Sequence, residues 1–412
     1  MATGIPNKNQ SSTMPTDISL NYCEKKYKKQ ILSGKHSQYN VVWANDDNTQ
    51  NKLFFGDNLD ALLYLLDNGY KERINLIYID PPYSTSCAFL NKKQEVAYND
   101  NLVGYEYIEF LRERIIVLYE LLSKTGSFYI HLDERMIFPM KLILDEIFGT
   151  NNFRAFITRK KCSTKNTTYS TYGDISDYIL FYTKSKQYTW NRPYISWTNE
   201  KILEQYPCVE EDTGRRFKKV PIHAPGVRNG ETGKMWRGLM PPTGKHWQYT
   251  PAKLDELDAA GEIVWSKNGN PRRKVYFDEQ KGIPIQNIWL DYQDFINQSQ
   301  KSSGYPTEKN FDMLKMIVSS SSNEGDLVLD CFVGSGTTLE AADKLGRTWI
   351  GIDNSKESIK TTSTRMLHGC LPYGDYVTEK TTNIQSINTN HHFQIFAEED
   401  KKSDLLDYCD FK

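Results

Sequence analysis

An apolar run from Ile74 to Ile79 ends at Asp80-Pro81-Pro82-Tyr83, and it constrains the fold more than any other stretch of this sequence. The run is short, β-branched and aromatic, which predicts a buried parallel strand. Proline has no amide hydrogen, so neither proline can join a sheet ladder and the chain must leave the sheet there. Ligands bind at the carboxyl ends of strands in open α/β sheets. We therefore expect a ligand site at Asp80.

The groups at this strand end suit a flat amine. Asp80 and the carbonyl of Pro81 can accept two N–H hydrogen bonds, and the ring of Tyr83 can stack on the ligand. A plain strand-to-loop turn with an N-capping aspartate is the structural alternative for so short a motif.

A second predicted strand, 326–330, leads into Cys331-Phe332-Val333-Gly334-Ser335-Gly336-Thr337-Thr338. A helix is predicted over 339–345, followed by a strand that ends at Asp353. Glycines at such a turn let a ligand approach the backbone, and the later acid suits ribose hydroxyls. Leu339 replaces the third glycine of a dinucleotide site, and no Lys-Ser/Thr pair marks a P-loop. The pattern favours a nucleoside ligand without a pyrophosphate.

The two stretches together resemble the amino-group DNA methyltransferases, whose signatures are Asp-Pro-Pro-Tyr and Phe-x-Gly-x-Gly. Their order, with the catalytic motif first, is that of the family's beta group. The resemblance covers 52–368 and includes Phe55-Gly56-Asp57-Asn58 and Tyr305-Pro306-Thr307-Glu308-Lys309. It implies methyl transfer from S-adenosylmethionine to adenine N6 in a specific sequence of double-stranded DNA. This is the modification reaction of a restriction-modification system.

The resemblance also implies an architecture. The expected fold is a circularly permuted, seven-stranded, Rossmann-like α/β methyltransferase sheet with an inserted target-recognition domain. The alternating strand and helix signals by themselves give the α/β class. The expected division is a flexible arm (1–23), a catalytic part (24–183), a target-recognition region (184–291), a cofactor-binding part (292–368) and a C-terminal tail (369–412).

Site residues follow from the matched motifs. The resemblance makes Asp80, Pro81, Pro82 and Tyr83 the catalytic residues. It assigns cofactor binding to Asp57, Asp80, Thr307, Lys309, Asp330, Phe332, Gly334, Ser335, Gly336, Thr337 and Asp353. For Asp57, a helix N-cap is an equally good structural reading. The chain departs from the family at Tyr305, Asn310 and Cys331, where similar enzymes often have His, Pro and Pro.

The net charge of −1 conceals a strong asymmetry. The stretch 159–290 holds 22 Lys and Arg against 14 Asp and Glu, a net charge of +8, which leaves −9 for the remainder. A basic portion of this kind suits a phosphate-facing surface, although a solvated face without a partner has the same composition. The basic loop after 158 and the turns of the insertion supply the expected DNA contacts: Arg159, Lys160, Lys161, Arg215, Arg216, Arg228, Arg237, Arg272 and Arg273.

The composition limits which kinds of site and which cellular compartments we expect. The seven cysteines show no zinc-type spacing, so we expect reduced thiols, no metal site and a cytoplasmic protein. No apolar run is long enough to span a membrane. His131 lies in an apolar predicted strand, which is more typical of a core histidine than of a catalytic base.

Other functions stay open. Methylation of cytosine N4 poses the same chemical problem, but similar enzymes usually have Ser before Pro-Pro-Tyr, so Asp80 favours adenine. Protein-amide methyltransferases usually carry Asn-Pro-Pro-Tyr and lack a basic insertion, and an RNA substrate is also less favoured. A catalytically silent DNA-binding relative would need a broken site, whereas both motifs are intact. The resemblance further implies a cognate restriction endonuclease, and it makes a homodimer an expectation because dimers are frequent in the family.

Overall fold

The computed structural model describes residues 18–34, 37–82, 88–90, 96–99, 104–163, 170–279, 281–294, 308–369 and 391–409. The chain forms two compact units. The larger unit comprises Met1–Pro193 and Gln286–Lys412, and the smaller unit comprises Tyr194–Ile285. The smaller unit falls inside the predicted target-recognition region.

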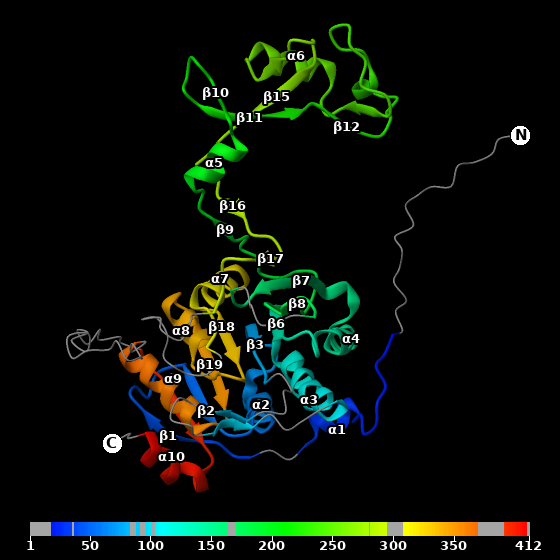
Figure 1. The fold of residues 1–412 in the computed structure, drawn as a ribbon. Helices are drawn as coiled ribbons and strands as arrows, with labels where there is room; N and C mark the ends of the chain where they lie inside the picture. Colours follow the sequence, from blue (N-terminus) through cyan, green and yellow to red (C-terminus); the bar gives the residue numbers. More distant parts are fainter. Residues whose placement is uncertain are drawn as a thin grey trace, which may run out of the picture. The chain divides into compact units, whose positions relative to one another are not determined.

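The larger unit is built on a ten-stranded sheet with the order β1-β20-β2-β19-β18-β3-β6-β8-β7-β17 (Figure 1). The strands from β20 to β6 in this order are parallel, and β8 is antiparallel to β6 and β7. The strands are β1 (Asn40–Ala44), β2 (Lys52–Phe55), β3 (Ile74–Ile79), β6 (Leu122–Leu132), β7 (Phe153–Lys160), β8 (Ser176–Thr183), β17 (Ile288–Trp289), β18 (Leu327–Asp330), β19 (Thr348–Asp353) and β20 (Gln394–Ala397).

The sheet contains the expected seven strands and extends beyond them. The consecutive run from β2 to β7 supplies seven, while β20 and β1 extend one edge and β17 the other. β20 comes from the predicted C-terminal tail (369–412). Phe396 of β20 stacks on Phe54 of β2 with ring centroids 4.7 Å apart. The tail therefore takes part in the core.

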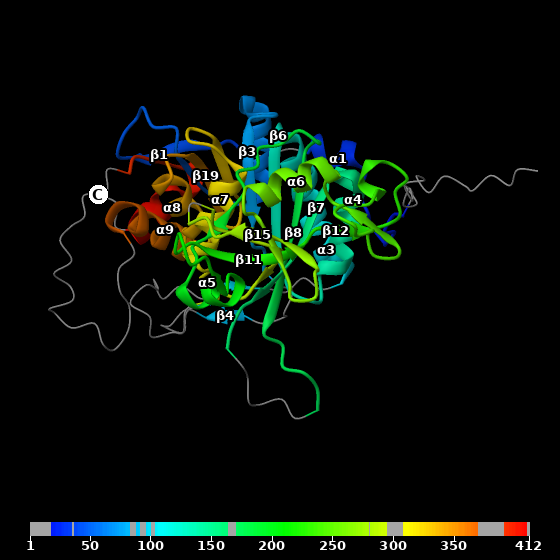
Figure 2. The same cartoon turned by 90° about the horizontal axis from the view of Figure 1, so that it is seen from above.

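Helices cover both faces of this sheet, as the two views in Figures 1 and 2 show. One face carries α2 (Asn58–Leu65), α3 (Tyr105–Leu121) and α4 (Ile137–Phe148). The other carries α7 (Phe311–Ser321), α8 (Thr337–Lys344) and α9 (Lys356–His368). Two further helices lie at the periphery: α1 (Lys28–Leu32) contacts α3, and α10 (Lys402–Cys409) contacts α9.

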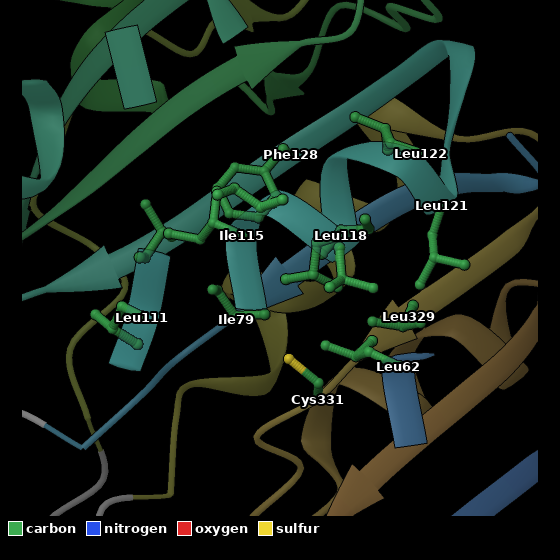
Figure 3. Packing of buried hydrophobic residues seen from close by; sticks show 14 of the residues in the cluster. Leu62, Ile79, Leu111, Ile115, Leu118, Leu121, Leu122, Phe128, Leu329 and Cys331 are labelled. Atoms are coloured by element: carbon green, nitrogen blue, oxygen red, sulfur yellow. The ribbon is translucent and has the colours of Figure 1, made fainter. Parts of the chain in front are cut away.

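The main hydrophobic core lies under α3 (Figure 3). Leu111, Ile115 and Leu118 recur at helical spacing and have no exposed surface. They pack against Ile79 of β3 and Phe128 of β6. Burial of each such side chain stabilises the fold by about 1.5–3 kcal/mol. The core therefore fixes β3, and with it the position of the Asp80 loop.

The end of the predicted N-terminal arm is not loose. Leu20 and Tyr22 pack against the main core. The Tyr22 hydroxyl donates a 2.5 Å hydrogen bond to Glu109 Oε2 on α3. The expectation of a flexible arm is therefore wrong for these two residues, because both pack against the core and the Tyr22 hydroxyl donates to a carboxylate. Residues 1–17 lie outside the described part of the chain.

The smaller unit has a β-rich fold with its own core. It contains a four-stranded antiparallel sheet, β10-β11-β15-β14, and two strand pairs, β12-β13 and β16-β9. Trp236 and Trp247 are buried there and pack with Leu254 and Ile263, so these tryptophans are core residues. The elements are β9 (Tyr194–Ile195), α5 (Asn199–Gln205), β10 (Cys208–Val209), β11 (Arg216–Pro221), β12 (His223–Pro225), β13 (Lys245–Trp247), α6 (Pro251–Ala259), β14 (Ile263–Trp265), β15 (Pro271–Tyr276) and β16 (Ile283–Pro284).

Two short strands, β4 (Ala88–Leu90) and β5 (Val96–Asn99), form a separate antiparallel pair after the Asp80 loop. Within the described residues, no helix combines the length and the apolarity needed to cross a membrane.

Candidate active site

Asp80 stands directly after β3, where the order of the sheet reverses. β3 pairs with β18 on one side and β6 on the other. From β18 the chain continues through α8 to β19, whereas β6 is followed by β8 and β7 on the opposite side. Ligands of open α/β sheets bind outside the strand ends at such a switch point. The predicted catalytic aspartate therefore occupies the position at which this fold offers a ligand site.

Lys309 reaches Asp80 from the segment before α7. Its Nζ lies 3.0 Å from Asp80 Oδ2, and only 8% of Lys309 is exposed. The ion pair joins the predicted catalytic motif to the predicted cofactor motif. Sequence reasoning placed both residues in the site but did not predict their contact. Thr307, the other predicted residue of this motif, lies outside the described residues.

Helix α3 holds the loop that follows Asp80. The Tyr107 hydroxyl donates a hydrogen bond to the carbonyl oxygen of Pro82, and Pro81 is buried. Sequence reasoning missed Tyr107, although an aromatic residue on the inner face of the next helix is a signal that could have suggested a contact. Tyr83, which is predicted to stack on the substrate, lies outside the described residues.

Asp57 is both a helix cap and an ion-pair partner. Its Oδ1 accepts hydrogen bonds from the backbone N–H groups of Leu59 (2.8 Å) and Asp60 (3.3 Å) at the start of α2. Its Oδ2 lies 3.0 Å from Arg114 Nη2. The side chain is nevertheless 50% exposed, so the carboxylate can accept another hydrogen bond. The capping role is confirmed, and the contact with the adenine of the cofactor stays a prediction.

Arg114 connects Asp57 to the cofactor loop, and sequence reasoning did not single it out. Its Nε donates to the Asn58 side-chain oxygen, and the Asn58 amide donates to the Cys331 carbonyl at 2.8 Å. The guanidinium lies 3.5 Å from the centroid of the Phe110 ring, which is 6.2 Å from the Phe332 ring. An arginine on the apolar face of α3 is costly to bury, and this feature could have identified it.

The glycine turn after β18 has the backbone that its sequence predicts. Gly334 and Gly336 have positive φ angles of 52° and 78°, which favour glycine. The Gly334 N–H donates to Asp353 Oδ2 at 2.9 Å, and the hydroxyls of Ser335 and Thr337 lie 2.9 Å apart. These contacts set the shape of the turn between β18, α8 and β19.

Gly336 is also required by packing. A Cβ atom at this position would lie 2.8 Å from the Thr362 hydroxyl of α9. Any larger residue there would clash with the Thr362 side chain and strain the α8–α9 contact. Substitution of Gly336 therefore cannot separate cofactor binding from folding.

Three acids, Asp80, Asp330 and Asp353, lie near one another at the carboxyl ends of the neighbouring strands β3, β18 and β19. Burial, the largest cause, together with the charges of Asp80 and Asp353, raises the pKa of Asp330 from 3.8 to about 7. Hydrogen bonds from Thr338 and from the Phe332 N–H, the latter 2.9 Å long, act in the opposite direction. Burial also raises the pKa of Asp353. The strand ends thus concentrate acidic groups that can accept hydrogen bonds.

The basic residues predicted to contact DNA differ in whether they form ion pairs with carboxylates of the protein. Five have no carboxylate partner within the described part of the chain, namely Lys160, Arg215, Arg216, Arg228 and Arg272. Three form ion pairs, namely Lys161 with Asp174 (2.7 Å), Arg237 with Asp255 (3.0 Å) and Arg273 with Glu262 (3.2 Å).

The prediction that Arg159 contacts DNA is wrong. Arg159 lies on strand β7 rather than in a loop and has no exposed surface. Its guanidinium lies 2.7 Å from Asp177 and 2.8 Å from Asp294. Burial alone would lower the pKa of Arg159, but its hydrogen bonds to these two carboxylates raise it overall. The period-two burial that includes Ile157 continues to Arg159, so alternation along the strand could have predicted the inward orientation.

His131 is a buried core histidine, as the sequence analysis expected. Its Nδ1 lies 2.8 Å from the Tyr78 hydroxyl and its Nε2 lies 2.8 Å from Asp177 Oδ2. Among the described residues, no cluster of His, Cys, Asp and Glu could hold a metal ion.

Comparison with known proteins identifies the family. Residues 74–364 match the N6_N4_Mtase family, described as DNA methylase. The chain is 47% identical over 365 residues to the type II methyltransferase M.EcaI of Enterobacter cloacae, a match that covers 87% of this chain and 80% of that protein. It is 27% identical over 341 residues to the Mod subunit of the type III restriction-modification enzyme StyLTI of Salmonella typhimurium, covering 72% of this chain and 50% of the relative.

A solved structure, the M1.HpyAVI–SAM complex, is similar with a TM-score of 0.40 and 17% identity, covering 76% of this chain and 98% of that one. Enzymes of the matched family take their methyl group from S-adenosylmethionine. The family match and the 47% identical relative show that this chain belongs to the N6_N4_Mtase family of DNA methylases, the amino-group DNA methyltransferases of the restriction-modification type.

Proposed function

We propose that this enzyme methylates the N6 amine of adenine in a specific sequence of double-stranded DNA, as the modification enzyme of a restriction-modification system. The observation that carries the proposal is the acid at the first position of Asp80-Pro81-Pro82-Tyr83, held at the strand end by Lys309. Enzymes that act on cytosine N4 usually have Ser at this position. Because the matched family contains both kinds of enzyme, the identity of the base is the point to be tested.

The target amine needs help because its lone pair is delocalised into the ring. Asp80 and the Pro81 carbonyl would accept its two N–H bonds and direct the lone pair outward. Tyr83 would stack on the base, which must first leave the duplex. S-adenosylmethionine supplies an electrophilic methyl group when bound. The chain's own residues position the amine and stabilise the positive charge that develops on nitrogen, without a covalent intermediate.

The proposed cofactor site includes the glycine turn after β18. Gly334 and Gly336 give this turn its positive φ angles, and the cofactor is proposed to approach the backbone there. Asp57, Asp330 and Asp353 are acceptors for the adenine amine and the ribose hydroxyls. We assign the remaining contacts to the other residues of the matched motifs, namely Thr307, Lys309, Phe332, Ser335 and Thr337.

Lys309 contacts Asp80 directly and also lies in the cofactor motif. A lysine so placed can bind the methionine carboxylate with one N–H and retain Asp80 with another, since an ammonium has three donors. Asp80 in turn can face the methionine ammonium. Because both residues would contact the cofactor and Asp80 would also contact the target amine, the arrangement supports adjacent sites for the methyl donor and for the target base.

DNA contacts are proposed for the basic residues without carboxylate partners, separately on each of the two units. Arg215, Arg216, Arg228 and Arg272 belong to the smaller unit, and Lys160 belongs to β7. Phosphate contacts from such residues would orient the duplex. Lys161 and Arg237 would contribute only after leaving their present carboxylate partners, and Arg273 is proposed to stay paired with Glu262. A cognate restriction endonuclease is the proposed biological partner. The proposed localisation is the cytoplasm, where the DNA substrate would be.

Mass analysis of nucleosides decides between the candidate activities. Unmodified duplex DNA is incubated with the enzyme and labelled S-adenosylmethionine and then digested to nucleosides. We expect N6-methyladenine as the methylated product. N4-methylcytosine would overturn the adenine assignment and retain amine methylation. Absence of label in any DNA, with the protein folded and bound to DNA, would indicate a catalytically silent relative.

A further inference from the structure

Five polar side chains form a continuous chain of contacts in the larger unit. Tyr78 of β3 contacts His131 of β6, which contacts Asp177 of β8, as described above. Arg159 of β7 binds Asp177 through its Nε (2.8 Å) and Nη2 (2.7 Å). The same guanidinium binds Asp294 through Nη1 and Nη2, both at 2.8 Å. The first four residues are at most 2% exposed.

The two carboxylates fix the direction of the hydrogen bonds that they accept. A carboxylate can only accept, so the Nε2 of His131 carries the hydrogen that is shared with Asp177. His131 Nδ1 and the Tyr78 hydroxyl lie 2.8 Å apart, and the hydroxyl can donate to a neutral imidazole or accept from a protonated one. Burial raises the pKa of Tyr78 well above its ordinary value, so this hydroxyl stays protonated. Each link therefore has one donor and one acceptor.

Burying such a chain of polar side chains in a core has a high cost in free energy. Ion pairs lose their hydration on burial, and well-packed apolar residues of similar volume are often as stable or more stable. The opposite face of the same strands is filled mainly by apolar residues such as Ile77, Ile130 and Leu180. Because these five polar side chains lie on one face of the sheet only, we look for a role of theirs besides stability.

The first link lies next to the reacting groups. Tyr78 is two residues before Asp80, and after burial the charge of Asp80 is the next cause that raises the pKa of Tyr78, so the two side chains lie near each other. The ladder between β3 and β6 ends at the pair Ile79 and Ile130, and Pro81 has no N–H with which to continue it. Beyond Ile79, side-chain contacts rather than the ladder must set the position of the loop.

The last link lies in the segment by which the chain re-enters the larger unit after the smaller one. β17 of this segment pairs with β7, where Trp289 is opposite Arg159. The Asp294 N–H donates to the Lys161 carbonyl at 2.9 Å. Arg159 Nη1 also donates to the Tyr292 carbonyl at 3.3 Å. Arg159 thus joins this returning segment to the sheet interior.

We infer that Tyr78, His131, Asp177, Arg159 and Asp294 act as a positioning chain, which holds the end of β3 and so places Asp80 for methyl transfer. None of the five touches the methyl group or the base in this mechanism. The inference rests on the proposed transfer to an exocyclic amine, whichever base carries that amine. It makes the transfer step, rather than substrate binding, depend on a set of buried contacts.

The main test is Tyr78→Phe, which removes one hydroxyl and keeps the ring. The rate of a single methyl transfer is measured with sheared, unmodified genomic DNA and labelled S-adenosylmethionine, both saturating. Small displacements of reacting groups can lower rates by up to about a hundredfold. We expect a loss of about tenfold or more, with the affinities for DNA and cofactor within about twofold of the wild type.

Tyr129→Phe is the matched control. Tyr129 is buried, lies on the same strand as His131, and its hydroxyl lies 2.7 Å from Ser321 outside the chain of five. We expect it to lower the melting temperature about as much as Tyr78→Phe and to leave the transfer rate unchanged. Equal rate losses in the two variants, or a wild-type rate in Tyr78→Phe, would overturn the inference.

A double-mutant cycle tests whether the chain acts as a unit. Asp294→Asn alters the far end, where the side chain is 33% exposed and folding is least at risk. We expect it to lower the transfer rate as well, and the double variant to be no slower than the slower single variant. Multiplicative losses would show independent effects and contradict the inference.

If Tyr78→Phe does not fold, the comparison of Asp294→Asn with Tyr129→Phe takes its place, and a wild-type rate in Asp294→Asn would overturn the inference. The identity of the methylated base does not enter these rate ratios. A cytosine product would therefore refute the proposed function while leaving this inference standing.

Discussion

Asp80 and Lys309 form a 3.0 Å ion pair, although one follows β3 and the other precedes α7. Because Lys309 is almost fully buried, the pair is poorly screened by solvent and fixes the distance between the two motifs. The proposed mechanism gives the two residues different roles. In it, Asp80 accepts from the target amine, while Lys309 provides positive charge for the cofactor carboxylate.

Replacement of the acid should affect the reaction more than binding. Bonds from Asp80 to the amine strengthen as positive charge develops on nitrogen. We expect Asp80→Ala to lower the single-turnover rate by about a hundred- to a thousandfold while duplex DNA binding is retained. Single-turnover methylation at saturating DNA and cofactor measures this. A near-normal rate would show that another group holds the amine.

Replacement of the lysine should affect the cofactor. A hydrogen bond to a charged group contributes about 1.5–3 kcal/mol, so Lys309→Met should weaken S-adenosylmethionine binding about ten- to a hundredfold in a calorimetric titration. The matched control is Lys344→Met, which removes a lysine of α8 that is half exposed and paired with Glu340. Equal affinities for the two variants would remove Lys309 from the cofactor site.

Arg159 should matter for stability. Its removal leaves Asp177 and Asp294 without their buried cation, and breaking such a pair typically costs 3–5 kcal/mol. We expect Arg159→Met to lower the free energy of unfolding by about this amount in urea titrations. Lys160→Met, one residue further on the same strand, should change it by less than about 0.5 kcal/mol. Similar effects in both variants would mean that the buried network contributes little.

Neighbouring arginines of β15 provide a paired test of DNA contact. Arg272 is exposed, whereas Arg273 pairs with Glu262 and donates to the Tyr249 hydroxyl at 2.6 Å. We expect Arg272→Gln to weaken DNA binding and to reduce the log–log salt slope by about 0.9, the value for one phosphate contact. Arg273→Gln should leave the slope unchanged. The reverse pattern would place DNA on the other face of this strand.

The raised pKa of Asp330 predicts a pH dependence of stability. Between its ordinary value of 3.8 and about 7, the folded state binds a proton that the unfolded state has lost. Stability from this group is therefore lost as the pH rises through that window, by up to about 1.4 kcal/mol per pH unit.

Asp330→Asn removes this titration and keeps a similar shape. We expect the stability of the variant, relative to the wild type, to increase as the pH rises from 4 to 7 and then to become constant. Urea unfolding of both proteins at several pH values gives the comparison. A difference that does not change with pH would show that Asp330 titrates normally.

The sequence alone determined the elements that local pattern specifies. The strand Ile74–Ile79 and the strand Thr348–Asp353 were predicted with the bounds that the structure has. Continuous apolar runs bounded by proline, glycine or an acid leave little choice of conformation, because each side chain must be buried and the ladder must stop. The tight turn after β18 was also predictable from local sequence, because glycine readily adopts the positive φ angles found there. The predictions for Tyr83 and Thr307 concern residues outside the described part.

Tertiary structure decided which side chains meet. Arg159 belongs to a basic stretch in the sequence, yet β7 turns it inward to two carboxylates that lie far away along the chain. The contact of Lys309 with Asp80 likewise depends on strand order, which no local pattern encodes. A charge run specifies composition but not orientation, because the free energy of a charged side chain depends on partners that only the folded sheet brings within reach.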